Sequence, residues 1–154
     1  MASAYLSRTP SSTGNRKLFT FSCWLKRASL GADGGIFNVY ENDNNYFRIR
    51  FNADNLQVSN VDSGSTTMNL VLSRLQRDVN GYYHLVVAYD SAQSTTADRC
   101  KIYTNGVLET SLSTSTYPSQ NANTFTNLQF PTQLGRTRPS NHYFDGQMAH
   151  VHFV

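Results

Sequence analysis

Aromatic, guanidinium and amide side chains are concentrated in two stretches of this 154-residue sequence. One is YFRIRFN (46–52), in which polar and apolar residues alternate, and the other is GRTRPSNHYFD (135–145). An aromatic ring can stack on the apolar face of a sugar, while guanidinium and amide groups hydrogen-bond to its hydroxyl groups. The two stretches predict contact with a glycan or a protein partner, although such residues also occupy ordinary sheet surfaces and protect strand edges. The candidate ligand-binding residues are Tyr46, Arg48, Arg136, Arg138, Asn141, His142 and Tyr143.

The sequence contains no clear pair of catalytic carboxylates. Hydrolysis of a glycosidic bond needs two of them at a fixed separation. The only glutamates are Glu41 and Glu109. Glu41 and Asp43 lie in the turn-forming run ENDNN (41–45), with no third acidic residue following in register, so a solvated turn is the simpler interpretation. The sequence also lacks the Gly-x-Ser-x-Gly elbow of a serine hydrolase. We therefore expect a protein that is not an enzyme.

The composition indicates strands. Hydrophobic residues make up 39% of the chain and charged residues only 15%, against a usual charged share of about 25%. Ser, Thr and Asn, which favour turns and strands over helix interiors, fill the difference. Nine tyrosines and nine phenylalanines add to the strand-forming residues. We expect one all-β domain over residues 1–154.

The charge is mild and scattered, with a net value of +3. The basic pairs Arg16-Lys17 and Lys26-Arg27 are interpreted as solvated strand ends, so no nucleic-acid partner is expected. No apolar run approaches the roughly 18 residues of a membrane span. The run MASAYLSRTP (1–10) lacks the apolar core of a signal peptide.

Hairpin and alternation signals place the strands. Asn105-Gly106 in CKIYTNGVLE (100–109) predicts a two-residue type I′ hairpin, because both turn positions need positive φ. YYHLVVAYD (82–90) is apolar at nearly every position, which predicts a central strand covered on both faces. The polar composition of residues 111–127 predicts a long connection. Residues 72–77 could form a helical turn, which is an alternative to strand for that segment. Further strands are expected at 4–9, 18–27, 36–41, 46–52, 56–61, 66–76, 128–137 and 143–154.

This spacing of strands is typical of a two-sheet antiparallel sandwich. Its predicted inward residues are Phe47, Ile49, Leu85, Val87 and Ile102. Two cysteines, Cys23 and Cys100, are too few for a disulfide framework. They are either two buried free thiols or one disulfide between neighbouring strands.

Four segments, in this order, resemble a laminin-G-like domain of the concanavalin A-like lectin/glucanase superfamily. They are YYHLVVAYD (82–90), DRCKIYTNGV (98–107), QLGRT (133–137) and FDGQMAHVHF (144–153). FTFSCWLKR (19–27) is similar to the first core strand of that family, with Trp24 at its tryptophan position. The resemblance covers roughly residues 18–154 and implies a two-sheet antiparallel jelly roll.

The chain departs from the family pattern at two places. Tyr83 stands where the family usually has tryptophan, and Ala149-His150 stands where an acidic pair is common. The Glu-x-Asp-x-x-Glu run of the glucanases on this fold is also missing. Many members bind calcium, which takes six to eight oxygen ligands, and the resemblance makes Asp43 and Asp90 the candidate ligands here.

The run YLSRTPSSTGNRKLFTFSCWLKR (5–27) is also similar to laminin-G-like domains in structural proteins of marine tailed phages. That similarity implies a virion surface or another extracellular location. We therefore expect a non-enzymatic recognition module, carbohydrate-binding and carried on a virion or other surface assembly. The alternative is a structural domain whose partners are other virion protein subunits.

Overall fold

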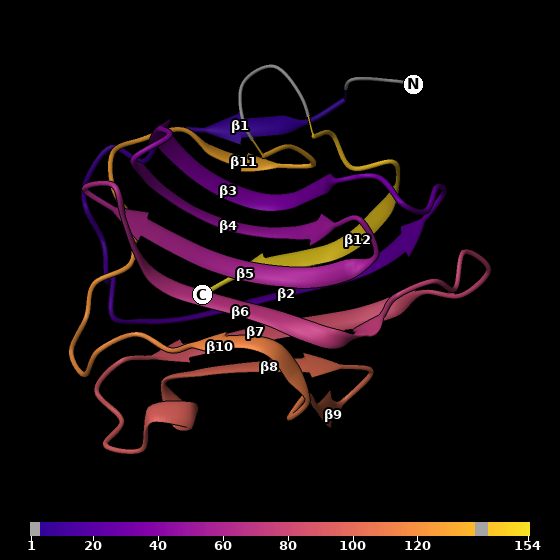
Figure 1. Ribbon diagram of the computed structural model, residues 1–154. Helices are drawn as coiled ribbons and strands as arrows, with labels where there is room; N and C mark the ends of the chain where they lie inside the picture. The colour runs from indigo at the N-terminus through magenta and orange to yellow at the C-terminus, as the bar shows by residue number, and fades with distance from the viewer. Residues whose placement is uncertain (1–3, 138–141) are drawn as a thin grey trace.

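The computed structural model describes residues 4–137 and 142–154, which form a sandwich of two antiparallel β-sheets (Figure 1). The large sheet has seven strands in the order β1–β11–β3–β4–β5–β6–β10, and the small sheet has five in the order β12–β2–β7–β8–β9. The predicted two-sheet antiparallel jelly roll is confirmed. The large sheet consists of β1 (Leu6–Arg8), β3 (Gly34–Asn42), β4 (Asn45–Asn52), β5 (Asn55–Asp62), β6 (Ser65–Leu75), β10 (Leu112–Thr116) and β11 (Thr132–Leu134). The small sheet consists of β2 (Leu18–Arg27), β7 (Tyr83–Asp90), β8 (Cys100–Thr104), β9 (Val107–Leu108) and β12 (Gly146–Phe153), with a short 3-10 helix, η1 (Thr96–Arg99), before β8.

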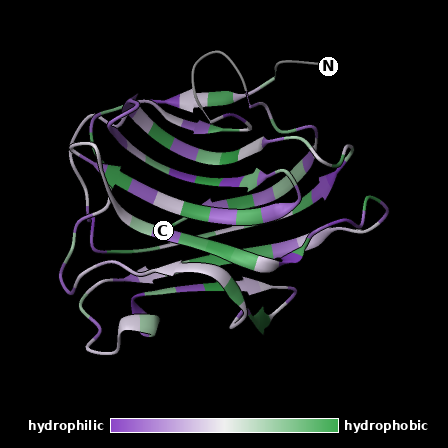
Figure 2. Cartoon of the chain, viewed as in Figure 1, coloured by the Kyte–Doolittle hydropathy of each residue, from purple (hydrophilic) through white to green (hydrophobic). Residues whose placement is uncertain are grey.

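Alternation along each strand separates a buried face from an outer face. In β4, Phe47, Ile49 and Phe51 are buried while the residues between them are half-buried on the other side. Figure 2 shows this as alternating hydrophobic and hydrophilic bands on the central strands of the large sheet. The predicted inward positions are confirmed, since each is at most 2% exposed: Phe47, Ile49, Leu85, Val87 and Ile102.

Hairpin turns form where the sequence predicts them. Asn105 and Gly106 join β8 to β9 with φ of 52° and 79°, the positive values that a type I′ turn requires. The Asn105 side chain also accepts a hydrogen bond from the backbone N–H of His84 at 2.8 Å, which fastens this turn to β7.

Two expectations about the strands are wrong. β7 is central in its sheet but buried on one face only, because one face of the small sheet packs on the large sheet and the other faces away from the sandwich. The segment 111–127 is not only a connection, since β10 pairs with β6 as an exposed edge strand rich in Ser and Thr. The strand expected at 66–76 is confirmed over the alternative of a helical turn, because β6 continues as a strand to Leu75.

The two cysteines are buried free thiols. Cys23 pairs with Leu85, and Cys100 with Tyr89, so β7 lies between the two cysteine-bearing strands. Strands separated by a third are about 10 Å apart, beyond the roughly 7 Å that a disulfide spans between Cα atoms. Burial raises the pKa of both thiols to about 12, which keeps them protonated.

Arg27 closes one end of the sandwich and corrects the expectation of a solvated strand end. It is 3% exposed, and its guanidinium lies 4.3 Å above the Phe51 ring. Its Nη1 donates to the Gln76 carbonyl at 2.5 Å, and its Nη2 to the Ala53 carbonyl at 3.0 Å. Nη2 also lies 3.1 Å from Oδ1 of Asp54. A residue of the small sheet thereby joins the β4–β5 hairpin to the end of β6.

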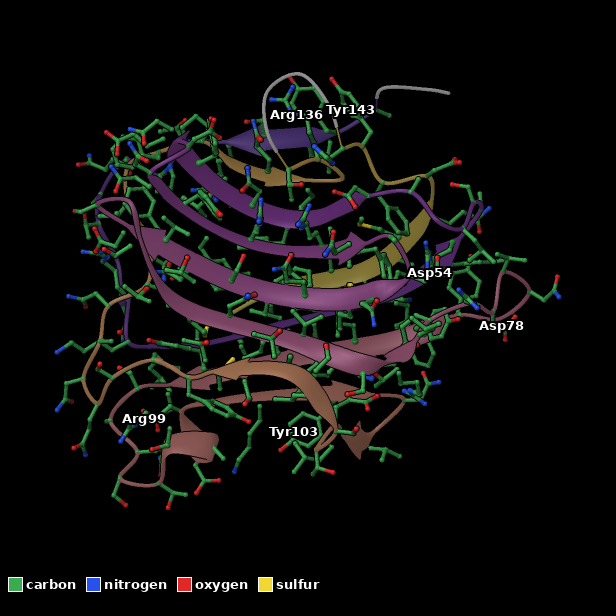
Figure 3. All side chains as sticks on the ribbon, viewed as in Figure 1. Asp54, Asp78, Arg99, Tyr103, Arg136 and Tyr143 are labelled. Carbon is green, nitrogen blue, oxygen red and sulfur yellow. The ribbon has the colours of Figure 1, made fainter. Side chains whose placement is uncertain are left out.

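Asp54, visible beside this hairpin in Figure 3, is held as a carboxylate. Its Oδ1 accepts the Gly31 N–H at 2.8 Å and its Oδ2 accepts Nε of Arg77 at 2.8 Å. The Gly31 hydrogen bond, followed by Arg77 and Arg27, lowers the pKa of Asp54 against the opposing effect of burial.

Replacing Asp54 by asparagine removes the charge that faces buried Arg27. We expect the free energy of unfolding to fall by about 3 kcal/mol, because breaking a buried ion pair leaves an uncompensated charge. Urea denaturation followed by circular dichroism measures this. The matched control is Asp98→Asn, which breaks the exposed pair with Lys101 and is expected to change stability little. An equal loss in both variants would contradict the role of burial.

The lowered pKa of Asp54 also predicts a pH dependence. A carboxyl with a lower pKa in the folded state than its usual 3.8 stabilises the fold above that value. This contribution is lost as the pH falls through the folded-state pKa. The stability difference between the wild type and Asp54→Asn should therefore narrow as the pH is lowered from about 6 to about 2.5. Denaturation at each pH tests this, and a constant difference would show that ionisation of Asp54 is not responsible.

Candidate functional site

The outward side chains of the large sheet form a continuous polar surface across β11, β3, β4, β5 and β6. Antiparallel register brings them into rows: Arg48 pairs with Asn38 on one side and Ser59 on the other. We call this surface the polar face. Its members are Asn38, Arg48, Arg50, Gln57, Ser59, Asn69 and Gln133.

Cross-strand hydrogen bonds fix both arginines of the polar face. Nε of Arg48 donates to Oγ of Ser59 at 3.1 Å. Nε of Arg50 donates to Oε1 of Gln57 at 2.7 Å, and Nε2 of Gln57 donates in turn to Oδ1 of Asn69 at 2.8 Å. The guanidinium groups are therefore oriented before any ligand arrives, which lowers the entropy cost of binding.

The smaller members of the polar face are buried although they point away from the core. Asn38 is 1% exposed, Ser59 2% and Gln57 7%. Buried polar groups must be hydrogen-bonded, and the rows supply those bonds, including Nδ2 of Asn38 to Oε1 of Gln133 at 3.4 Å. The result is a rigid floor of amide and hydroxyl groups beneath the arginines.

Tyr46 lies at the end of the polar face next to the β3–β4 hairpin. The Arg48 guanidinium lies 4.6 Å from the centre of its ring, a cation–π arrangement. Both predicted residues of β4 are thus placed together on one side of the sheet, as period-2 alternation requires.

The connection from β11 to β12 crosses the opposite end of the polar face at Gly35. A Cβ at Gly35 would lie 2.2 Å from the Thr137 nitrogen, so only glycine permits this approach. Backbone bonds fasten the connection: the Gly35 N–H donates to the His142 carbonyl at 3.0 Å, and the Thr137 N–H donates to the same oxygen at 3.2 Å.

Arg136 and two tyrosines form a cluster on this connection. The Arg136 guanidinium lies 3.7 Å from the centre of the Tyr5 ring and 5.9 Å from that of Tyr143. Figure 3 shows Arg136 and Tyr143 beside one another at the edge of the large sheet. Arg136 itself is only 8% exposed, so the tyrosine rings rather than the guanidinium form most of the exposed surface of the cluster.

Asp33 links the connection to the polar face. Its Oδ2 lies 2.6 Å from Nη1 of Arg50 and 3.2 Å from Nδ1 of His142, and its Oδ1 accepts the Ala53 N–H at 2.9 Å. The two stretches that the sequence marks as candidates therefore meet in space through one carboxylate.

The predicted site residues fall into two groups at opposite ends of β4. Tyr46 and Arg48 form the first group, and Arg136, His142 and Tyr143 form the second. Because a strand rises about 3.3 Å per residue, the outward positions from Tyr46 to Arg50 span about 13 Å. The remaining two predicted residues, Arg138 and Asn141, lie outside the described residues.

The candidate calcium ligands lie at the ends of strands in different sheets, Asp43 after β3 of the large sheet and Asp90 at the end of β7 of the small sheet. Asp43 sits in the β3–β4 hairpin, where one oxygen accepts the Tyr40 hydroxyl at 3.3 Å. Asp90 ends β7, and its oxygens accept the Ala92 N–H at 3.1 Å and Nε2 of Gln93 at 2.6 Å. In the described part of the chain, no group of three or more His, Cys, Asp or Glu is placed to hold a metal. Calcium binding stays a prediction.

Comparison with solved structures shows the same fold in several proteins at low sequence identity. The mouse laminin alpha1 chain, domains LG4-5, superposes with a TM-score of 0.68 at 14% identity, covering 97% of this chain and 38% of that one. Domain 4 of AbnA, an extracellular arabinanase from Geobacillus stearothermophilus solved with arabinotriose, gives 0.61 at 17% identity, covering 92% and 61%. A CBM40 module of a Ruminococcus gnavus sialidase, bound to α2,3-sialyllactose, gives 0.59 at 17% identity, covering 88% and 72%. The chain thus spans well under half of the laminin structure.

No curated protein sequence is similar enough to the chain to be a match. Within residues 4–137 and 142–154, no helix has the length and apolar character needed to span a bilayer. The family model described as "Concanavalin A-like lectin/glucanases superfamily" matches residues 2–154, nearly the whole chain. With the laminin-like sandwich, this match confirms the resemblance to a laminin-G-like domain, and the chain belongs to the Laminin_G_3 family of the concanavalin A-like superfamily.

Proposed function

We propose that this chain is a non-catalytic carbohydrate-binding module that holds a glycan along the polar face. The observation that carries this proposal is the orientation of Arg48 and Arg50 by cross-strand hydrogen bonds on a buried amide floor. Fixed guanidinium and amide groups at strand spacing suit the adjacent hydroxyl groups of sugars. Tyrosine rings at both ends, Tyr46 and Tyr143, supply apolar surfaces for stacking.

The dimensions of the face favour a short oligosaccharide. The span of about 13 Å from Tyr46 to Arg50 is longer than one sugar ring. Asp33 is the carboxylate that contacts the face, and it is held by Arg50 and His142. Such an arrangement suits an acceptor of hydrogen bonds better than a general acid, which needs a second carboxyl facing it across a cleft.

The solved relatives support a saccharide ligand by analogy. The AbnA domain was solved with arabinotriose and the CBM40 module with sialyllactose. We infer a setting on the surface of a larger assembly, such as a phage virion, where a recognition module would meet its glycan.

A docking role in an assembly is the second candidate, and one feature favours it. The sandwich is open between the edge strands β1 and β12, where a groove of about 540 Å³ reaches the core. The groove is mostly apolar, which suits another protein subunit better than a glycan. Its lining includes Leu6, Phe21, Phe37, Leu134, Val151 and Phe153.

Replacing Arg48 by alanine tests the proposed function. We expect the wild type to bind at least one glycan on an array, and the variant to bind it about tenfold to a hundredfold more weakly. The reason is that a hydrogen bond from a charged donor contributes about 1.5–3 kcal/mol. Isothermal titration with the selected glycan gives the affinities. The matched control is Arg74→Ala, which removes an exposed arginine paired with Glu109 away from the polar face, and its affinity should equal the wild type.

Two outcomes would contradict glycan binding at the polar face. One is that the array shows no bound glycan while the chain copurifies with another subunit of its own particle, which would favour the docking role. The other is that Arg48→Ala and Arg74→Ala bind the glycan as tightly as the wild type, which would place the site elsewhere.

A further inference from the structure

Trp24 stands on the face of the sandwich opposite the polar face. It lies in the middle of β2, points away from the core and is 42% exposed. It is the single tryptophan of the chain. Removing the exposed apolar area of such a ring from water would contribute favourably to the binding of a ligand.

The indole ring of Trp24 is upright, with one covered and one open face. Trp24 pairs in register with His84 on β7, and the two rings stack with centroids 4.8 Å apart and planes 27° from parallel. That separation equals the spacing between neighbouring strands, so the rings stand on the sheet side by side. The second face of the indole is therefore turned toward β12.

On that side the directly opposite residue has a small side chain. The residue opposite Trp24 on β12 is Ala149, which is exposed, and β12 is the edge strand of the sheet. A methyl group is too short to cover an upright indole. We call this place, with Trp24 as its wall and Ala149 as its floor, the Trp24 shelf.

A bulge in β12 shapes the shelf. The register shifts between Ala149 and His152, and His150 takes a φ of 48°, which is costly for a residue with a side chain. Ala149 and His152 are three positions apart on β12, yet they pair with Trp24 and Ser22, which are two positions apart on the outward face of β2. Bulges commonly re-aim side chains beside binding sites.

Hydrogen-bonding side chains flank the shelf on both strands. On β12 they are the amide of Gln147 and the imidazole of His152. On β2 they are the hydroxyl of Ser22, which pairs with His152, and the ammonium of Lys26, which pairs with Gln147. The Tyr82 hydroxyl donates to Gln147 and orients that amide. An open aromatic wall bordered by amide, hydroxyl and imidazole groups matches a ring that is apolar on its face and polar at its rim.

We propose that the Trp24 shelf is a second saccharide site, which stacks one neutral pyranose ring against the indole. The shelf lies on the other sheet from the polar face, so a single short stretch of glycan could not contact both surfaces at once. The module would then join two glycan chains, or two parts of one folded polysaccharide, in a bivalent manner.

Fluorescence of the single tryptophan reports on this site alone. We expect titration of the purified chain with cellohexaose, laminarin or a chitin hexamer to change the emission of Trp24 saturably for at least one of them. Binding at the polar face leaves Trp24 untouched, so the signal should persist in Arg48→Ala. This separates the shelf from the proposed function: either site can fail while the other binds.

Filling the shelf tests the geometry. Ala149→Leu places a larger side chain against the open face of the indole without touching the core, and it should weaken the fluorescence-detected affinity by at least about tenfold. The matched control is Ala88→Leu, which enlarges another outward alanine of the same sheet, on β7 away from Trp24, and it should keep the wild-type affinity. Circular dichroism checks that both variants fold.

Three results would overturn the proposal. The first is an emission spectrum that none of the three saccharides changes. The second is a saccharide response that survives unaltered in Ala149→Leu. The third is a concentration-dependent emission change without any saccharide, abolished by Ala149→Leu and accompanied by dimers in sedimentation, which would assign the shelf to a second copy of the chain.

Discussion

Phenylalanine rings that pack between the two sheets determine which side of each strand faces the core. Phe19 of the small sheet meets Phe47 of the large sheet at 5.5 Å between centroids, and Phe153 meets Phe37 at 5.2 Å. Each such contact adds about 0.5–1.5 kcal/mol to the burial of its rings. Once these rings point inward, alternation leaves every second residue outward, so one constraint creates both the polar surface of one sheet and the indole surface of the other.

The features that depend on local rules could be predicted from the sequence. Strict alternation in β4 places Phe47 inward and Arg48 outward with no further information. The type I′ turn follows from the sterics of Asn105-Gly106 alone. The strand β10 was missed because an exposed edge strand of Ser and Thr has no apolar alternation to reveal it.

The features that depend on tertiary contacts could not be predicted. Arg27 ends a strand next to a lysine, which suggests solvent, and only the folded hairpin supplies the carbonyls that bury it. Asp33 lies in a glycine-rich loop with no motif around it, and its role appears when β4 and the β11–β12 connection meet. The pairing of His152 with Ser22 beside Trp24 depends on a bulge in β12, and a bulge shifts the period on which sequence patterns rely.

The glycine at position 35 has a consequence for how such modules diversify. Main-chain groups make the hydrogen bonds between Gly35 and the connection that crosses it, and the contact of the His142 side chain with Asp33 adds to them. A segment that is held largely by its main chain can exchange most of its side chains while the layers below stay intact. The scaffold and the specificity of the module can therefore evolve, or be engineered, separately.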